Sequence, residues 1–178
     1  MGIRALGYLV IGTRKPEEWS AFLTGIVGAM DAGRAADGAS LYRIDDRAFR
    51  FRIEPGEKER LLAAAYEVAD ADALADLKEH VSAAGRPVTD GSPGEARERG
   101  VAAFFRTSDA AGHGLEFFHG NSRSDTPFVS PEGVSGFVTR DMGMGHVVYA
   151  TPDFNANHAF YRDVIGFGDT DIPRFHFS

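Results

Sequence analysis

The chain has 178 residues, of which 43% are hydrophobic, enough for one sizeable domain or for one domain and part of a second. Its formal net charge of −7 disfavours a binder of phosphate backbones, which gathers Lys and Arg on one face, so nucleic acid is not an expected partner. The absence of cysteine excludes disulfides, thiolate metal sites and a cysteine nucleophile. Any metal must therefore bind through His, Asp or Glu.

No apolar run in the sequence approaches the roughly 20 residues that a membrane-spanning helix needs. The first residues also lack the long apolar core that is typical of a secretory signal. We therefore expect no membrane partner and a cytoplasmic location.

The first predicted unit begins with a strand over residues 3–12, where apolar and small residues alternate loosely. A helix should follow, because Pro16 suits a first helical turn and a glycine, Gly25 or Gly28, can end it. Four apolar residues recur at helical spacing and predict its buried face: Trp19, Phe22, Leu23 and Ile26.

Two further strands are predicted in this unit, over residues 41–44 and 49–53, with a short turn at Asp45 and Asp46 between them. The second of these strands alternates apolar residues with arginine, which implies one face in water. The first unit therefore has the order strand, helix, strands.

A second unit repeats this order. Residues 62–68 predict a strand, and the side chain of Asp70 or Asp72 can cap the helix that follows. Two more strands are expected over residues 101–106 and 115–118, separated by residues typical of turns.

A linker is predicted after the second unit, because residues 121–136 are rich in Ser, Pro, Gly and Asp and show no sustained periodicity. We place an N-terminal domain of two units at residues 1–120 and the linker at residues 121–140. Residues 141–178 are then the start of a C-terminal domain, with a strand from Gly145 and a helix that ends at a glycine.

This third unit matches the first at a constant shift of 138 residues, which brings Gly7-Tyr8-Leu9-Val10 onto Gly145-His146-Val147-Val148. The matches continue through the helix: Thr13 with Thr151, Ala21-Phe22 with Ala159-Phe160, Gly28 with Gly166, and Asp31 with Asp169. A structural repeat explains the agreement. A lone strand and helix would leave backbone donors and an apolar face exposed, so we expect a truncated third unit, or one that packs against something else.

His146 is the first candidate for chemistry, since an imidazole at the start of a strand can bind divalent iron, zinc or manganese. A hydrogen-bonded surface or core histidine is the alternative, because a metal site needs three convergent ligands. Glu116 is a second candidate ligand inside an apolar strand, although strand alternation also lets it point into water. His113 and His119 are expected on the surface.

The chain resembles the type I extradiol ring-cleavage dioxygenases, particularly those that act on bicyclic catechols, such as 2,3-dihydroxybiphenyl and 1,2-dihydroxynaphthalene. These enzymes belong to the vicinal oxygen chelate superfamily. The resemblance extends over nearly the whole chain and is carried by four stretches: Leu6-Gly7-Tyr8, Gly114–Gly120, Gly145–Val148 and Phe160–Phe167.

The resemblance implies an α+β fold of paired βαβββ modules, with the third module incomplete. It also implies Fe(II) held in the C-terminal domain by two histidines and a glutamate, of which His146 is the first histidine. Val148 is implied as an apolar wall of the catechol pocket. Glu116 would occupy the carboxylate position in the N-terminal domain, where Tyr8 replaces the histidine, so we leave it out of the metal site as a relic or a structural residue.

The implied activity is cleavage of a bicyclic or aryl-substituted catechol by O2 in the degradation of aromatic compounds, by a homo-oligomer. The second histidine, the glutamate and the acid–base residues are not in this sequence, so the chain alone is expected to be inactive. Two alternatives remain open: another metal enzyme of the superfamily, such as a glyoxalase-like isomerase, or a non-catalytic module that binds a small molecule.

Overall fold

The computed structural model describes residues 2–139 and 143–170 of the chain. The N-terminal elements of the chain, residues 3–55, form a βαβββ module. Its helix begins as an α-helix and continues without a break as a π-helix. The elements are β1 (Ile3–Thr13), α1 (Pro16–Phe22), η1 (Leu23–Val27), β2 (Met30–Arg34), β3 (Ser40–Arg43) and β4 (Phe51–Pro55).

A second module has the same order, with a short helix inserted before its last two strands. Its elements are β5 (Arg60–Val68), α2 (Ala71–Ala83), β6 (Thr89–Asp90), α3 (Pro93–Glu98), β7 (Ala103–Ser108) and β8 (Gly114–His119). The predicted α+β fold of paired βαβββ modules is thus confirmed.

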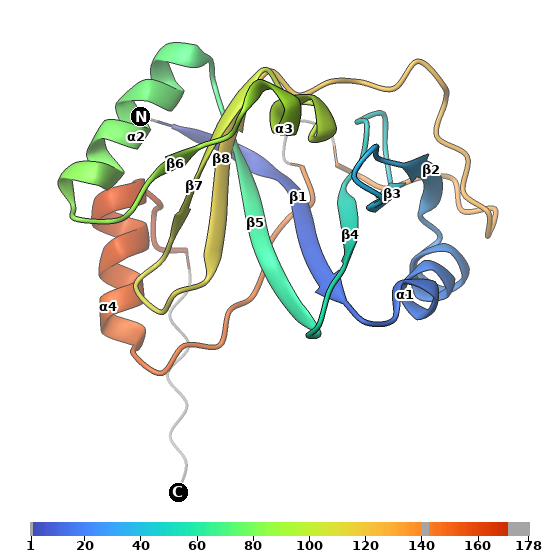
Figure 1. Ribbon diagram of the computed structural model, residues 1–178, viewed down its shortest axis with the longest axis horizontal. Coiled ribbons are helices and arrows are strands. Elements are labelled where there is room, and N and C mark those ends of the chain that lie inside the picture. The colour runs from blue at the N-terminus through green and yellow to red at the C-terminus, as the bar shows by residue number, and fades with distance from the viewer. Residues whose placement is uncertain (1, 140–142, 171–178) are drawn as a thin grey trace, which may run out of the picture.

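The two modules share one sheet, in the order β2-β3-β4-β1-β5-β8-β7-β6 (Figure 1). In each module the first strand pairs in parallel with the last, β1 with β4 and β5 with β8. The antiparallel pair β1 and β5 joins the modules at the centre of the sheet. Tyr8 and Glu116, on strands of different modules, are thereby brought within reach of each other.

Three elements were not predicted, and each has a physical reason. β2 is an edge strand whose residues are mostly exposed, and β6 has only two residues, so neither carries an apolar alternation. α3 spans six residues and has a capping box between Ser92 and Glu95, a signal that the sequence does contain.

The cap of α2 decides between the two predicted residues, because the Asp70 side chain accepts a hydrogen bond from the Ala73 amide at 2.9 Å. We expect Asp70→Ala to lower the free energy of unfolding by about 1 kcal/mol, since the amide loses its acceptor. Asp72→Ala should cost less, because Asp72 lies in the first turn and acts only through the helix dipole. Urea unfolding of both variants measures the difference, and equal costs would contradict the assignment of Asp70 as the cap.

The third unit keeps the predicted helix, as α4 (Phe154–Ala159) and η3 (Phe160–Ile165). Like α1 and η1, it passes from α-helix to π-helix and ends at a left-handed glycine, Gly166 at φ 86° and Gly28 at φ 78°. The closing hydrogen bonds also repeat at the 138-residue shift, from Ala29 to Leu23 at 2.8 Å and from Phe167 to Tyr161 at 2.9 Å. The predicted repeat is confirmed for the helix.

The strand predicted from Gly145 is wrong, because residues 145–150 form no strand. Among the described residues of this segment, backbone pairing with β1 is limited to Gly143, which forms a bridge to Leu6, and to Met144, whose amide donates to the Leu6 carbonyl at 3.0 Å. From Leu9 onward, the backbone groups of β1 on this same edge are hydrogen bonded to β4. Residues 145–150 therefore find no open edge, and a strand cannot form without one.

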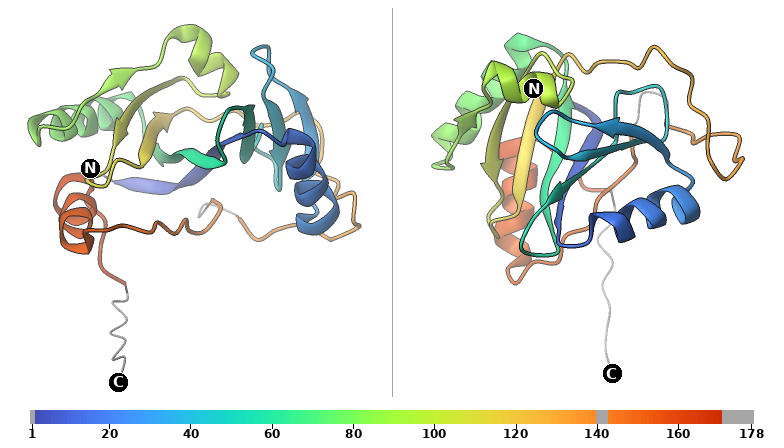
Figure 2. Two further views of the ribbon diagram at one scale, coloured as in Figure 1. Left: turned by 60° about the horizontal axis from the view of Figure 1, so that its bottom comes forward. Right: turned by 45° about the vertical axis from the view of Figure 1, so that its right-hand side comes forward.

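The α4–η3 helix lies beside α2 at one end of the sheet, whereas α1 lies at the other end (Figures 1 and 2). Phe160 and Ile165 are both buried and join the core that α2 and the sheet enclose. The third-unit helix is thus packed into the N-terminal part of the molecule. Among the described residues, no helix is both long and apolar enough to cross a membrane.

Candidate functional site

His146 lies in the irregular segment 145–150, and its side chain is exposed. It lines a pocket of about 400 Å³ between the beginning of β1 and the end of the third-unit helix. The other walls include Leu6, Tyr66 and Phe167. No hydrogen bond joins its imidazole to another described residue.

A complete metal site is not present in the described ranges 2–139 and 143–170, which contain no group of three His, Asp or Glu side chains placed to hold an ion. One imidazole cannot by itself hold iron in a site that needs three protein ligands. The role of His146 as an iron ligand stays a prediction. The same holds for Val148 as a pocket wall, since its side chain is 81% exposed.

Tyr8, which matches His146 at the shift of 138 residues, belongs to a buried charge cluster. We define the Glu116 cluster as Tyr8, Arg99, Arg106 and Glu116. The Glu116 carboxylate is 2% exposed and accepts hydrogen bonds from Tyr8 at 2.7 Å, from Arg99 at 2.7 and 2.8 Å, and from Arg106 at 3.3 Å. The expectation that Glu116 points into water is wrong, and both of its oxygens are occupied.

Arg99 supplies a positive charge that balances the buried Glu116 carboxylate. Its guanidinium forms a fork with the carboxylate, the strong geometry for this pair. Burial lowers the pKa of Arg99, but the hydrogen bonds and charge of Glu116 outweigh it and raise that pKa. Burial and the same carboxylate raise the pKa of Tyr8 well above its usual range. The phenol therefore stays protonated and donates a hydrogen bond to Glu116. These contacts support the placement of Glu116 outside the metal site.

The arginines of the Glu116 cluster are also fixed by an aromatic ring. Arg99 and Arg106 stand over Phe104, at 4.8 and 4.7 Å from the ring centroid. Arg106 makes a further ion pair with Glu95 at 2.7 Å, so the cluster is joined to α3. Neither arginine was singled out from the sequence, because pairing across β8, β7 and the end of α3 is a tertiary property.

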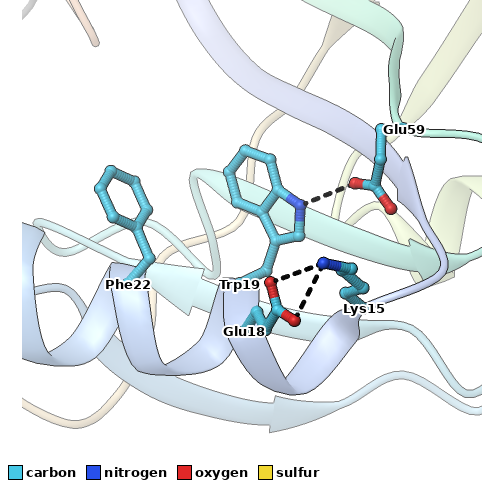
Figure 3. Close-up of a pocket in the computed structure, with 5 residues that line it drawn as sticks. All are labelled: Lys15, Glu18, Trp19, Phe22 and Glu59. Carbon is cyan, nitrogen blue, oxygen red and sulfur yellow. Dashed lines mark hydrogen bonds and ion pairs between the residues drawn. The ribbon is translucent and has the colours of Figure 1, made fainter.

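A second pocket, of about 450 Å³, lies on α1 and is lined by Lys15, Glu18, Trp19, Phe22 and Glu59 (Figure 3). Its polar groups satisfy one another, since Glu59 accepts from the Trp19 indole at 3.3 Å and Lys15 pairs with Glu18 at 3.1 Å. Phe22 adds an apolar surface that is 47% exposed. Both carboxylates of this pocket are therefore already engaged, Glu18 by Lys15 and Glu59 by Trp19.

His113, expected on the surface, is instead half-buried and hydrogen bonded through Nδ1 to Asp109 at 2.7 Å. Asp109 itself is fully buried at the end of β7. The side chains of Asn157 and Tyr161, from the third-unit helix, reach the same carboxylate at 3.0 and 3.1 Å. The sequence identified Ser108-Asp109 only as turn residues, and no pattern marked them as a contact with the third unit.

The paired modules around one sheet define the class of protein, and the chain has the vicinal oxygen chelate fold. A crystal structure of BphC, described as a halotolerant catechol dioxygenase, superposes with a TM-score of 0.89 at 32% identity, over 93% of this chain and 56% of that one. The family model for the dihydroxybiphenyl dioxygenase BphC D1 domain matches residues 6–56.

Sequence relatives give the family within this class. Biphenyl-2,3-diol 1,2-dioxygenase of Paraburkholderia xenovorans (strain LB400) is 41% identical over 97% of this chain. An iron-dependent extradiol dioxygenase of Rhodococcus jostii (strain RHA1) is 37% identical over 98% of it. The chain belongs to the extradiol dioxygenase family, and it spans about 58% of the length of these two relatives.

Proposed function

We propose that the full-length polypeptide containing this sequence is an Fe(II)-dependent extradiol dioxygenase that cleaves a bicyclic or aryl-substituted catechol with O2 in the degradation of aromatic compounds. The observation that carries the proposal is the 41% identity to a biphenyl-2,3-diol 1,2-dioxygenase over 97% of the chain. The name of the Rhodococcus relative, an iron-dependent enzyme, supports iron as the metal.

His146 is proposed as one of the three protein ligands of the iron, and Val148 as a wall of the catechol pocket. The other ligands are proposed to lie in sequence that corresponds to the remaining length of the relatives. When bound, the iron would supply Lewis-acid and redox chemistry to the catechol and O2. On this proposal residues 1–120 form a non-catalytic domain, residues 121–140 a linker and residues 141–178 the start of the catalytic domain.

The Glu116 cluster supports a non-catalytic N-terminal domain, because a guanidinium already neutralises its buried carboxylate. The relation to the family also motivates two further proposals, a homo-oligomer and a cytoplasmic location. Gel filtration with light scattering tests the first, and fractionation of the source cells tests the second.

Oxygen uptake with biphenyl-2,3-diol tests the proposed function. The full-length protein, reconstituted with ferrous iron under anaerobic conditions, is expected to consume O2 when air is admitted and to form a ring-cleavage product. The same protein assayed for isomerisation of a glutathione hemithioacetal is expected to be inactive. Isomerase activity without oxygen uptake would replace the dioxygenase proposal by the glyoxalase-like alternative.

The 178-residue chain by itself is expected to show no turnover in the same assay, because the described part of it provides a single candidate ligand, His146. Oxygen uptake with iron supplementation measures this. Turnover at the rate of the full-length protein would contradict the proposed distribution of iron ligands.

A further inference from the structure

The carboxylate of Asp109 joins the N-terminal sheet to the third-unit helix. We define the Asp109 cluster as Asp109, His113, Asn157 and Tyr161. Oδ1 of Asp109 accepts from the amides of Ala111 and His113 at 3.0 and 2.8 Å, which shapes the turn between β7 and β8. Oδ2 accepts from the side chains of His113, Asn157 and Tyr161 at 2.7, 3.0 and 3.1 Å.

Two of these donors come from the third unit, 48 and 52 residues further along the chain. Asn157 is 5% exposed and uses both ends of its amide, because its Oδ1 accepts from the Ala111 amide at 2.9 Å. Tyr161 binds from the next turn, at the start of η3. The helix is therefore held at two points one turn apart, which fixes its rotation as well as its position.

The polar contacts add a specificity that the apolar contacts lack. Phe160 and Ile165 pack the helix into the core, but apolar packing is non-directional. A buried carboxylate is stable only while its donors stay in place, and a shift of the helix would remove two of the five donors to Asp109, the side chains of Asn157 and Tyr161. Burial by itself would raise the pKa of Asp109, but the contacts of His113 and Tyr161 outweigh it and lower that pKa, which keeps the charge in place.

The same turn also reaches the segment that carries His146. The His113 ring stacks on the Tyr149 ring, with centroids 4.5 Å apart and an angle of 25° between planes. Tyr149 lies three residues after His146, and Met144, two residues before it, is hydrogen bonded to Leu6. The segment is thus attached to the N-terminal domain on both sides of the candidate ligand.

We propose that Asp109 is a positioning residue for the metal site: from the N-terminal domain, it fixes the third-unit helix and the Tyr149 side of the segment, so that His146 is presented in one place. The inference rests on the proposed function of His146. Its physical basis is preorganisation, because a ligand that is already held loses less freedom when it binds a metal. The otherwise non-catalytic domain would then contribute to iron affinity without touching the iron.

The test uses the full-length protein and the variant Asp109→Asn. In this variant an NH2 group replaces the oxygen Oδ2, and it cannot accept the hydrogen bonds that the surrounding side chains donate there. Asp163→Asn is the matched control, since Asp163 lies on η3 but is exposed, and among the described residues its carboxylate pairs with its neighbour Arg162 alone. The apparent dissociation constant for ferrous iron is measured by chelator competition, together with hydrogen exchange of residues 154–165. Residues 71–83 of α2 report on the stability of the domain itself.

Asp109→Asn is expected to weaken iron binding by up to about 10-fold, the lower end of the range for direct partners of metal ligands, because Asp109 acts on His146 only through the helix and the His113–Tyr149 stack. Exchange in residues 154–165 should accelerate while α2 stays protected, and Asp163→Asn should behave as wild type. Faster exchange with unchanged iron affinity would overturn the proposal and leave Asp109 a purely structural residue. If Asp109→Asn does not fold, Tyr161→Phe replaces it and must weaken iron binding measurably, and an unchanged affinity there overturns the proposal as well.

The wild-type arm distinguishes this inference from the proposed function. If the wild-type protein binds ferrous iron and consumes O2, and the Asp109→Asn variant binds iron with the same affinity, only the proposed role of Asp109 is contradicted. Wild-type protein that binds no iron and cleaves no catechol contradicts the proposed function, and the positioning role falls with it.

Discussion

Replacing His146 by alanine in the full-length protein is expected to reduce kcat/KM for biphenyl-2,3-diol by about 10²-fold or more and to lower the bound iron to well below one equivalent. Loss of outer partners alone costs a metal site roughly 10- to 100-fold, and loss of a direct ligand removes a metal–nitrogen bond as well. Two protein ligands are fewer than the three that such catalytic sites employ. Metal analysis and oxygen uptake on the same preparation measure both effects.

His80→Ala is the matched control for this variant, because His80 is also exposed but lies on α2, outside the segment that carries His146. The control should keep wild-type iron content and activity. Since the His146 side chain is exposed, its replacement should leave the unfolding transition of the iron-free protein unchanged. A His146→Ala protein with full iron content would show that the histidine is an ordinary surface residue, the alternative left open by the sequence.

Replacing Glu116 by alanine is expected to lower the free energy of unfolding by about 3–5 kcal/mol, the cost of breaking a buried ion pair by removing one partner. The fork between Arg99 and Glu116 is almost fully buried, at 8% and 2% side-chain exposure, so the arginine cannot find water in place of the carboxylate. The Tyr8 hydroxyl would lose its acceptor at the same time. Urea unfolding of the 178-residue chain followed by circular dichroism measures the change.

Glu95→Gln is the control for charge removal nearby. Glu95 pairs with Arg106 at 2.7 Å, but its side chain is 43% exposed, so this pair should contribute no more than about 1 kcal/mol. A Glu116→Ala variant as stable as Glu95→Gln would show that solvent enters the cluster and that the buried charges are not what holds it together.

Local patterns were read correctly where neighbours in sequence are also neighbours in space. The helical spacing and the terminal glycine predicted the first helix and its repeat, down to the left-handed Gly28 and Gly166. The predicted buried face of the first helix is wrong at Phe22 and Ile26, which are exposed. The motifs around His146 indicated the family, and the relatives confirmed it. Short or exposed elements such as β2 and β6 escaped prediction because their side chains carry no buried face.

The sequence by itself determined the repeated order of strand, helix and two strands and the exclusion of thiolate chemistry, because these depend on residue type and spacing. Tertiary structure alone decided three things. Glu116 is neutralised by Arg99, and residues 145–150 form no strand because β4 already pairs with β1. Asp109 binds the third-unit helix. In each case, groups far apart in the sequence form hydrogen bonds with the same carboxylate or the same strand edge, and only the folded chain brings them together.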